Sequence, residues 1–236
     1  GIFFDQEREA GDQILNIENL SCKLDGEILF SEINLNLTKS DKVIVYSKDS
    51  RAVSSFFQIL NNKLTPDSGS FDWGITTTQA YLPLDNDFLF NRSLSLVEWL
   101  RQWTEIEEER EEVYLRGFLG KMLFSGEEAL KSSNVLSGGE KIRCMLSKMM
   151  MSRSNVLILD EPTNHLDLES ITSFNNALKK FKGTLLCYTK DHLFAESLGN
   201  RIIELTPKGI IDRHLTFDEY MTDIKVKKLR NYMYSS

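Results

Sequence analysis

A chain of 236 residues has room for one large α/β domain and for no clear second one. Hydrophobic residues make up 41% of it and charged residues 27%, which is ordinary for a globular protein with a sizeable core. The net charge of −7 excludes a global basic field that would attract nucleic acid or anionic lipid.

The sequence predicts a cytoplasmic location. No run of about 18 apolar residues is present, and the start shows no signal-peptide pattern. The cysteines Cys22, Cys144 and Cys187 lie far apart and form no CxxC pair, which favours reduced, structural thiols. The chain begins with Gly1 rather than Met, so we expect a fragment or a processed chain.

The first third of the chain reads as strands with one helix. Residues 1–13 are polar and weakly patterned, like the end of a linker. Residues 42–47 (KVIVYS) have the β-branched composition of a buried strand. Other segments show shorter signals: strands at 14–20, 26–30, 33–37 and 81–82, a helix at 54–60 and a turn at 65–69.

The middle of the chain, residues 85–151, is predicted to be a helical insert. Leu96, Leu100 and Trp103 share one helical face, and residues 105–112 form a strongly acidic, solvated stretch. A methionine-rich stripe near the end of the insert is expected to pack in the core, because its spacing is helical: Ile142, Met145, Leu146, Met149 and Met150.

The last third alternates strands and helices, which favours a mainly parallel sheet covered on both sides. Residues 156–159 and 184–189 read as strands, with a helix over residues 168–181 between them, and a hairpin is expected at 202–212. The final 15 residues, 222–236, are expected to be a solvated basic helix or tail that carries Lys225, Lys227, Lys228 and Arg230.

Two motifs carry the chemistry: residues 136–140 (LSGGE) and, 20 residues after the first motif, residues 160–167 (DEPTNHLD). Ser137 is placed to cap a helix whose N-terminal amides, including those of Gly138 and Gly139, could hold an anion. Asp160, at the end of a hydrophobic strand, could hold Mg²⁺, and Glu161 could polarise an attacking water.

In this order and spacing the motifs resemble the signature and the Walker B and D-loop segments of ATP-binding cassettes. The string DEPTNHLD is similar to the ABC-F subfamily, cytosolic proteins with tandem cassettes that act on ribosomes. The resemblance covers residues 14–221 and implies an ATP-binding cassette fold. That fold has a RecA-like, mainly parallel sheet core, an N-terminal antiparallel β subdomain and an inserted α-helical subdomain.

The segment where a Walker A loop (GxxxxGK[ST]) belongs departs from that pattern. Ser47 and Ala52 replace its two glycines, Ser50 replaces a further glycine common in the family, and Val53 replaces the lysine. Only Ser54, the expected Mg²⁺ hydroxyl, remains. The Asp49 carboxylate would repel phosphate. The alternative is that Lys48 or Arg51 takes over the phosphate contact of the missing lysine.

Three further positions of the family pattern also differ. Leu24 stands where an aromatic stacks on adenine, Leu84 where a glutamine is usual, and Lys190 where the switch histidine is usual. His192 falls two residues later and is expected at the surface, and His165 is expected to have a structural or interface role.

By resemblance, the residues around a nucleotide fall into two sets. Those expected to face ATP held by a partner cassette are Ser137, Gly138, Gly139 and Glu140. Those expected in a weakened site of the chain's own are Ser50, Val53, Ser54 and Ser55 of the degenerate Walker A, Asp160 with Ser54 for Mg²⁺, Glu161 as a catalytic or vestigial residue, Asp167 of the D-loop and Lys190 at the switch position.

Three functions remain open on the sequence alone. The first is a binding module that closes its signature loop over ATP and Mg²⁺ held by a second cassette. The second is an ATPase with an altered phosphate loop that uses Ser54, Asp160 and Glu161. The third is a nucleotide-independent interaction scaffold. A role on the ribosome is implied only by the resemblance, and the acidic balance adds no support for RNA binding.

Overall fold

The computed structural model describes all 236 residues and forms two compact units. The sheet unit comprises Gln6–Leu84, Asn155–Pro162 and Lys182–Ser236. The helical unit comprises Gly1–Asp5, Asp85–Ser154 and Thr163–Phe181. None of the helices is both long enough and apolar enough to cross a membrane.

The core of the sheet unit is a six-stranded sheet in the order β5-β6-β7-β3-β8-β9. Neighbouring strands run parallel except that β9 pairs antiparallel with β8. The strands are β3 (Lys42–Tyr46), β5 (Gln79–Leu82), β6 (Val156–Asp160), β7 (Thr184–Tyr188), β8 (Arg201–Thr206) and β9 (Gly209–Arg213). Every residue of β6, β7 and β8 is buried, as expected for parallel strands covered on both faces.

A second, antiparallel sheet has the order β2-β1-β4, formed by β1 (Gln13–Leu24), β2 (Glu27–Thr38) and β4 (Ser68–Trp73). β1 and β2 pair as a hairpin, so the three short strands predicted over this region form two long ones. The sequence did not predict β4. Its residues, SGSFDW, are mostly of types with low strand propensity, and pairing with β1 sets their conformation.

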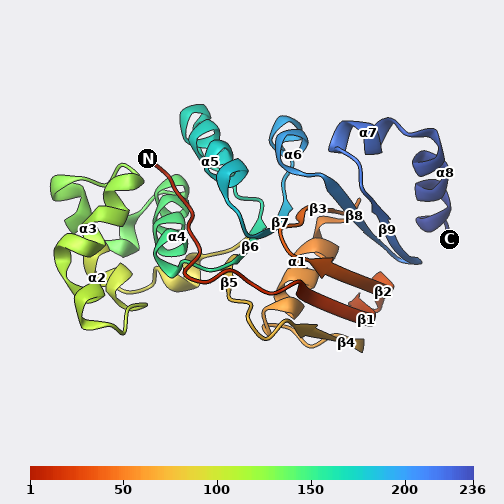
Figure 1. Cartoon of the computed structure of the whole chain (residues 1–236), viewed down its shortest axis with the longest axis horizontal. Helices are drawn as coiled ribbons and strands as arrows, with labels where there is room; N and C mark the ends of the chain where they lie inside the picture. The colour runs from red at the N-terminus through yellow and green to blue at the C-terminus, as the bar shows by residue number, and fades with distance from the viewer. The chain divides into compact units, whose positions relative to one another are not determined.

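Four helices accompany the sheets of this unit: α1 (Ser50–Leu60), α6 (His192–Leu198), α7 (Phe217–Thr222) and α8 (Ile224–Met233). α1 lies on the side of the six-stranded sheet that faces β1 and β2, and α6 lies on the opposite side (Figure 1). The buried residues of α1, including Phe56 and Phe57, join both sheets in one core.

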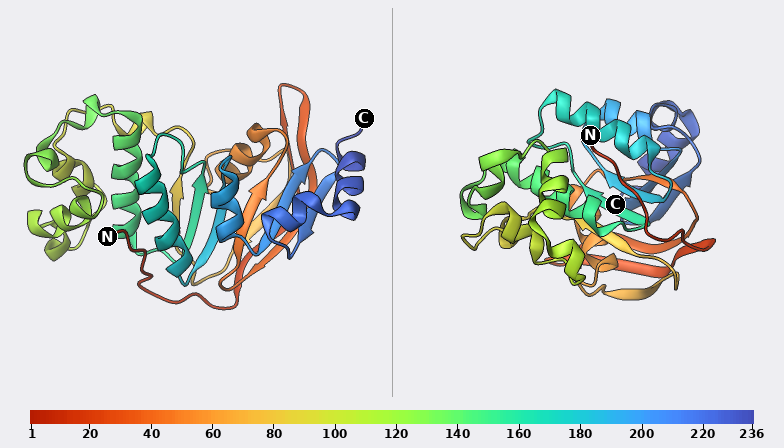
Figure 2. Two further views of the ribbon diagram at one scale, coloured as in Figure 1. Left: turned by 90° about the horizontal axis from the view of Figure 1, so that it is seen from above. Right: turned by 60° about the vertical axis from the view of Figure 1, so that its left-hand side comes forward.

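The C-terminal segment is not the solvated tail that was one expectation for residues 222–236. It forms α8, which lies with α7 beside the β8–β9 hairpin (Figure 2). Val226 and Met233 are buried, and the Arg230 guanidinium pairs with the buried Glu204 at 2.6 Å. The lysine-rich sequence predicted solvent exposure because the buried and ion-pairing residues occupy only one side of the helix.

The helical unit contains α2 (Leu96–Arg101), α3 (Glu112–Lys121), α4 (Gly138–Ser152) and α5 (Leu168–Lys180). Four short 3₁₀ helices precede α4 in the same unit: η1 (Asp87–Leu89), η2 (Glu107–Arg110), η3 (Gly126–Leu130) and η4 (Ser133–Val135). The predicted methionine stripe is buried on α4. In the N-terminal segment the Phe4 ring is buried and meets Phe174 edge-on, with 5.9 Å between ring centroids.

The predicted fold class is confirmed: a mainly parallel sheet core, an antiparallel β subdomain and helical elements. A parallel sheet gathers the residues that follow its strands at one edge. The segments after β3, β6 and β7 therefore lie close together, and they contain the residues predicted for a nucleotide site.

Candidate functional site

The signature loop, residues 136–140, forms the N-terminus of α4. The Ser137 hydroxyl accepts a hydrogen bond from the Glu140 amide at 3.2 Å, and the Glu140 carboxylate accepts one from the Ser137 amide at 3.0 Å. This reciprocal cap uses one acceptor site of the hydroxyl and leaves its proton free to donate outward. Ser137 and Gly138 are exposed. A hydroxyl and a helix N-terminus are thus presented at the surface of the helical unit, where an anion could meet them.

Electrostatics reinforce this cap. The Lys131 ammonium lies 2.6 Å from the Glu140 carboxylate, and its hydrogen bond lowers the pKa of that carboxyl. Glu140 therefore remains ionised, accepts the Ser137 amide and places negative charge beside the positive end of the helix dipole.

Both glycines of the signature loop face His165. A Cβ added to Gly139 would lie 2.6 Å from the His165 carbonyl oxygen, and one added to Gly138 would lie 3.0 Å from its ring. His165 has a φ of +70°, a left-handed conformation that brings its backbone to the helix start. The two glycines thus permit close packing within the helical unit, and His165 occupies a structural position.

Asp167 begins α5 in the same unit. Its carboxylate accepts the Ser170 amide at 2.7 Å, and this backbone hydrogen bond lowers the pKa of Asp167. The last residue of the DEPTNHLD string is therefore a helix cap in the structure.

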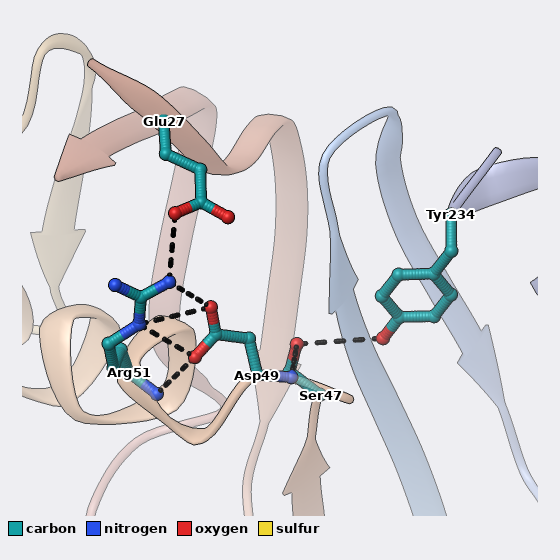
Figure 3. A network of polar contacts seen from close by, with 5 residues as sticks. All are labelled: Glu27, Ser47, Asp49, Arg51 and Tyr234. Carbon is teal, nitrogen blue, oxygen red and sulfur yellow. Dashed lines mark hydrogen bonds and ion pairs between the residues drawn. The ribbon is translucent and has the colours of Figure 1, made fainter. Parts of the chain in front are cut away.

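The phosphate-loop segment, residues 47–54, is shorter as a loop than predicted. α1 begins at Ser50 rather than near Ser54, because Asp49 caps it by accepting the Arg51 amide at 3.0 Å. The Arg51 side chain bonds the Asp49 carboxylate at 2.7 Å and reaches Glu27 at 3.0 Å (Figure 3). Hydrogen bonding from Arg51 lowers the pKa of Asp49. A permanent carboxylate therefore stands at the helix N-terminus, where a phosphate would otherwise be held.

The amide of Lys48 is also engaged. It donates to the Tyr234 hydroxyl at 3.0 Å. That hydroxyl also lies 3.5 Å from the Ser47 hydroxyl (Figure 3). The Ala52 amide donates to the Asp49 carbonyl oxygen at 3.0 Å. The N–H groups of Lys48, Arg51 and Ala52 are consequently bonded within the chain.

The side chains that replace the glycine and the lysine of a Walker A loop lie in the hydrophobic core. Ala52 and Val53 are fully buried, and Ser55 is buried as well. Neither Val53 nor Ser55 therefore reaches the surface where a phosphate would bind. Lys48 and Ser50, by contrast, line a pocket. The side chain at position 53 therefore contributes to packing.

Ser54 and Asp160 remain together. The Ser54 hydroxyl donates to the Asp160 carboxylate at 2.6 Å, and the second carboxylate oxygen is buried with no hydrogen-bond partner. Burial raises the pKa of Asp160 to about 6, and the bond from Ser54 opposes this shift. An orphaned carboxylate oxygen beside a serine hydroxyl has the chemistry of a partial magnesium site.

Glu161, next along the chain, is tied to the switch segment. Its carboxylate accepts the Lys190 amide at 2.7 Å and the Thr189 hydroxyl at 3.3 Å. Glu161 has a φ of +51° and is 7% exposed. In this arrangement its carboxylate positions the segment after β7.

A pocket of about 450 Å³ opens at the carboxyl ends of β3 and β7. Its lining comprises Tyr46, Ser47, Lys48, Ser50, Tyr188, Thr189, Lys190, His192, Phe217 and Met221. His192 is exposed and pairs with Asp218. Leu24 and Leu84, at the other two variant positions, are 38% and 55% exposed.

Comparison with known proteins identifies the family. The model of the ABC transporter family matches residues 25–164, more than half of the chain. The chain belongs to the ATP-binding cassette family. The dimeric cassette MJ0796, described in a post-hydrolysis state bound to ADP and Pi, matches 86% of this cassette and 99% of its own chain with a TM-score of 0.70 at 19% identity, a likeness that shows the fold.

Three relatives match the cassette by sequence. YkpA of Bacillus subtilis, an uncharacterized ABC transporter ATP-binding protein, is 48% identical over 98% of this chain and 43% of its own length. YbiT of Escherichia coli O157:H7, a probable ATP-binding protein, is 38% identical over 93% of this chain and 41% of its own length. EttA of Escherichia coli K12, named an energy-dependent translational throttle protein, is 27% identical over 86% of this chain and 36% of its own length. This cassette therefore spans less than half the length of the relatives it matches.

ATP and Mg²⁺ are the ligands that the family implies. Ser54 and Asp160 fit an ion in part, through the orphaned oxygen. The phosphate-loop segment does not fit a triphosphate, because Asp49 occupies the helix N-terminus and Val53 is in the core.

Sequence reasoning missed Tyr234 and Glu204. Their hydroxyl and carboxylate meet at 2.5 Å, although 30 residues separate them. One signal was available: Glu204 stands between Ile203 and Leu205 within a strand, and a buried carboxylate requires partners.

Proposed function

We propose that this cassette supplies its signature loop to ATP and Mg²⁺ held by a second cassette and does not itself hold the nucleotide that drives switching. The contrast between two regions supports this proposal. In the phosphate-loop segment, Asp49 accepts the Arg51 amide and Tyr234 accepts the Lys48 amide. In the signature loop, Ser137 caps α4, is exposed, and has a hydroxyl proton free to donate.

The relatives are consistent with a two-cassette arrangement. This chain spans 43% of YkpA and 41% of YbiT, so each relative has room for another cassette of similar size. The solved cassette MJ0796 is described as dimeric. A partner with a complete GxxxxGK[ST] loop would provide the site that this cassette lacks.

A role in translation, with the ribosome as a partner, is the finer part of the proposal. It is supported by EttA, whose name describes a translational throttle, and by the DEPTNHLD string. The net charge of −7 gives this cassette no general attraction to RNA, so ribosome contact would have to come from other parts of the whole protein.

A second candidate function is an ATPase with an altered phosphate loop. The observation in its favour is the preserved pair of Ser54 and Asp160, in which one buried carboxylate oxygen of Asp160 has no hydrogen-bond partner. Turnover that is lost in Glu161→Gln would support this alternative, and turnover equal in both proteins would reject it.

The proposal is tested by ATP-dependent association with a second cassette. The part of YkpA that this chain does not match serves as the partner, and analytical ultracentrifugation measures association with and without MgATP. We expect ATP-dependent association that Ser137→Arg reduces at least tenfold, because the long cationic side chain would fill the space for the partner's triphosphate.

Ser125→Arg is the matched control, since Ser125 is exposed in the same unit and its side chain caps no helix. It should associate like the unaltered protein. Association that is independent of ATP, or equally strong in the Ser137 variant, would contradict the proposal and favour a scaffold.

A further inference from the structure

The C-terminal helix lies against the phosphate-loop segment. The Tyr234 hydroxyl accepts the Lys48 amide at 3.0 Å and donates to the Glu204 carboxylate at 2.5 Å. The Lys48 ammonium lies 4.6 Å from the centre of the same ring. Backbone and side chain of one loop residue thus both contact one residue of the C-terminal segment.

Glu204 fixes the position of Tyr234. It is fully buried on β8 and accepts hydrogen bonds from the Tyr220 hydroxyl and the Arg230 guanidinium, both at 2.6 Å, as well as from Tyr234. Burial, followed by the nearby Glu204 charge, raises the pKa of the Tyr234 hydroxyl, so the proton stays in place. One buried carboxylate therefore connects α7, α8 and the loop contact.

The β8–β9 hairpin holds the end of α8 independently. Met233 is buried and its terminal carbon would lie 3.3 Å from a Cβ at Gly209. The Lys208 ammonium bonds the Ser235 hydroxyl at 2.9 Å and lies 4.3 Å from the centre of the Tyr232 ring. These contacts place Tyr234 at the loop without any contribution from the loop itself.

In a glycine-rich phosphate loop the backbone N–H groups are satisfied by the ligand's oxygen atoms. Here an oxygen atom of the chain satisfies one of them. We propose that α8 takes the place of a nucleotide in ordering the phosphate-loop segment, with the Tyr234 hydroxyl on the Lys48 amide as the ordering contact. The loop would then be fixed in one conformation whatever nucleotide is present.

The test is amide hydrogen exchange at Lys48, read by NMR in the full chain and in Tyr234→Phe. Removal of the hydroxyl should accelerate exchange of this amide about tenfold, the change expected for loss of one ordinary hydrogen bond. Tyr232→Phe is the control, because Tyr232 lies on the same helix and is 62% exposed. It should leave exchange at Lys48 unchanged, and amides of α4 should be unchanged in both variants.

Equal exchange at Lys48 in Tyr234→Phe and Tyr232→Phe would overturn the inference while leaving the proposed function intact. A second arm adds millimolar MgATP to the unaltered protein and should change nothing at Lys48. Protection of Lys48 by MgATP would show that a nucleotide orders the loop after all, and would count against both proposals.

Discussion

Burial changes the acidity of the Asp160 carboxyl group. Asp160 is 3% exposed, has one satisfied carboxylate oxygen and has a pKa raised to about 6 by burial. Because the folded-state pKa lies above that of the unfolded chain, protonation favours the folded state. The contribution is fully present below about pH 4, the unfolded pKa, and is lost as pH rises through 6.

The raised folded-state pKa of Asp160 gives the residue-scale prediction. Asp160→Asn removes the buried charge and retains an oxygen that can accept from Ser54, so at pH 8 the free energy of unfolding should rise by about 1–3 kcal/mol. At pH 4 the two proteins should be nearly equal. Urea denaturation at both values of pH measures the difference, and a variant that is less stable at pH 8 would contradict the burial argument.

Among single residues, sequence reasoning was strongest for the motif positions. Ser137 was expected to cap a helix, and it does. Val53 was known to replace a lysine, but the sequence could not show that its side chain would lie in the core. The partnership of Lys48 with Tyr234 could not be predicted, because 186 positions separate them and Tyr234 lies outside every motif.

At the scale of elements, α1 and α4 begin in contrasting ways. α4 begins with a serine cap followed by two glycines, and its N-terminus remains open to solvent. α1 begins at Ser50 behind an aspartate cap that carries its own arginine partner. The predicted start near Ser54 was late by four residues because the Asp49 cap was not recognised.

The glycines of α4 give the element-scale prediction. Gly139→Ala should lower the free energy of unfolding by about 1–3 kcal/mol without any nucleotide, because the new Cβ would lie 2.6 Å from the His165 carbonyl oxygen. Gly117→Ala in α3 is the control, since a Cβ there meets nothing within 4 Å and alanine favours helix.

Chemical denaturation of the two variants should therefore give opposite signs, with Gly117→Ala up to about 1 kcal/mol more stable than the unaltered protein. If Gly139→Ala were neutral, packing on His165 would not account for the glycine.

For the whole molecule, the arrangement of strands was predictable and the C-terminal cover was not. Alternation of buried strands with helices predicted the parallel sheet, and this sheet brings Asp160, at the end of β6, and Ser54, after β3, to the same edge. The packing of α8 depends on the ion pair of Arg230 with Glu204, a contact between residues 26 positions apart in a lysine-rich segment. Charge composition alone favoured solvent exposure there.

Taken over the whole cassette, the residues predicted to surround a nucleotide divide into an exposed signature loop and an internally bonded phosphate-loop segment. Isothermal titration of the isolated chain with MgATP tests this division most directly. We expect no saturable binding at submillimolar ATP, a dissociation constant weaker than about 1 mM corresponding to less than about 4 kcal/mol of binding free energy. A micromolar dissociation constant that Ser54→Ala weakens would contradict it, because the nucleotide would then bind over the segment that Asp49 and Tyr234 occupy.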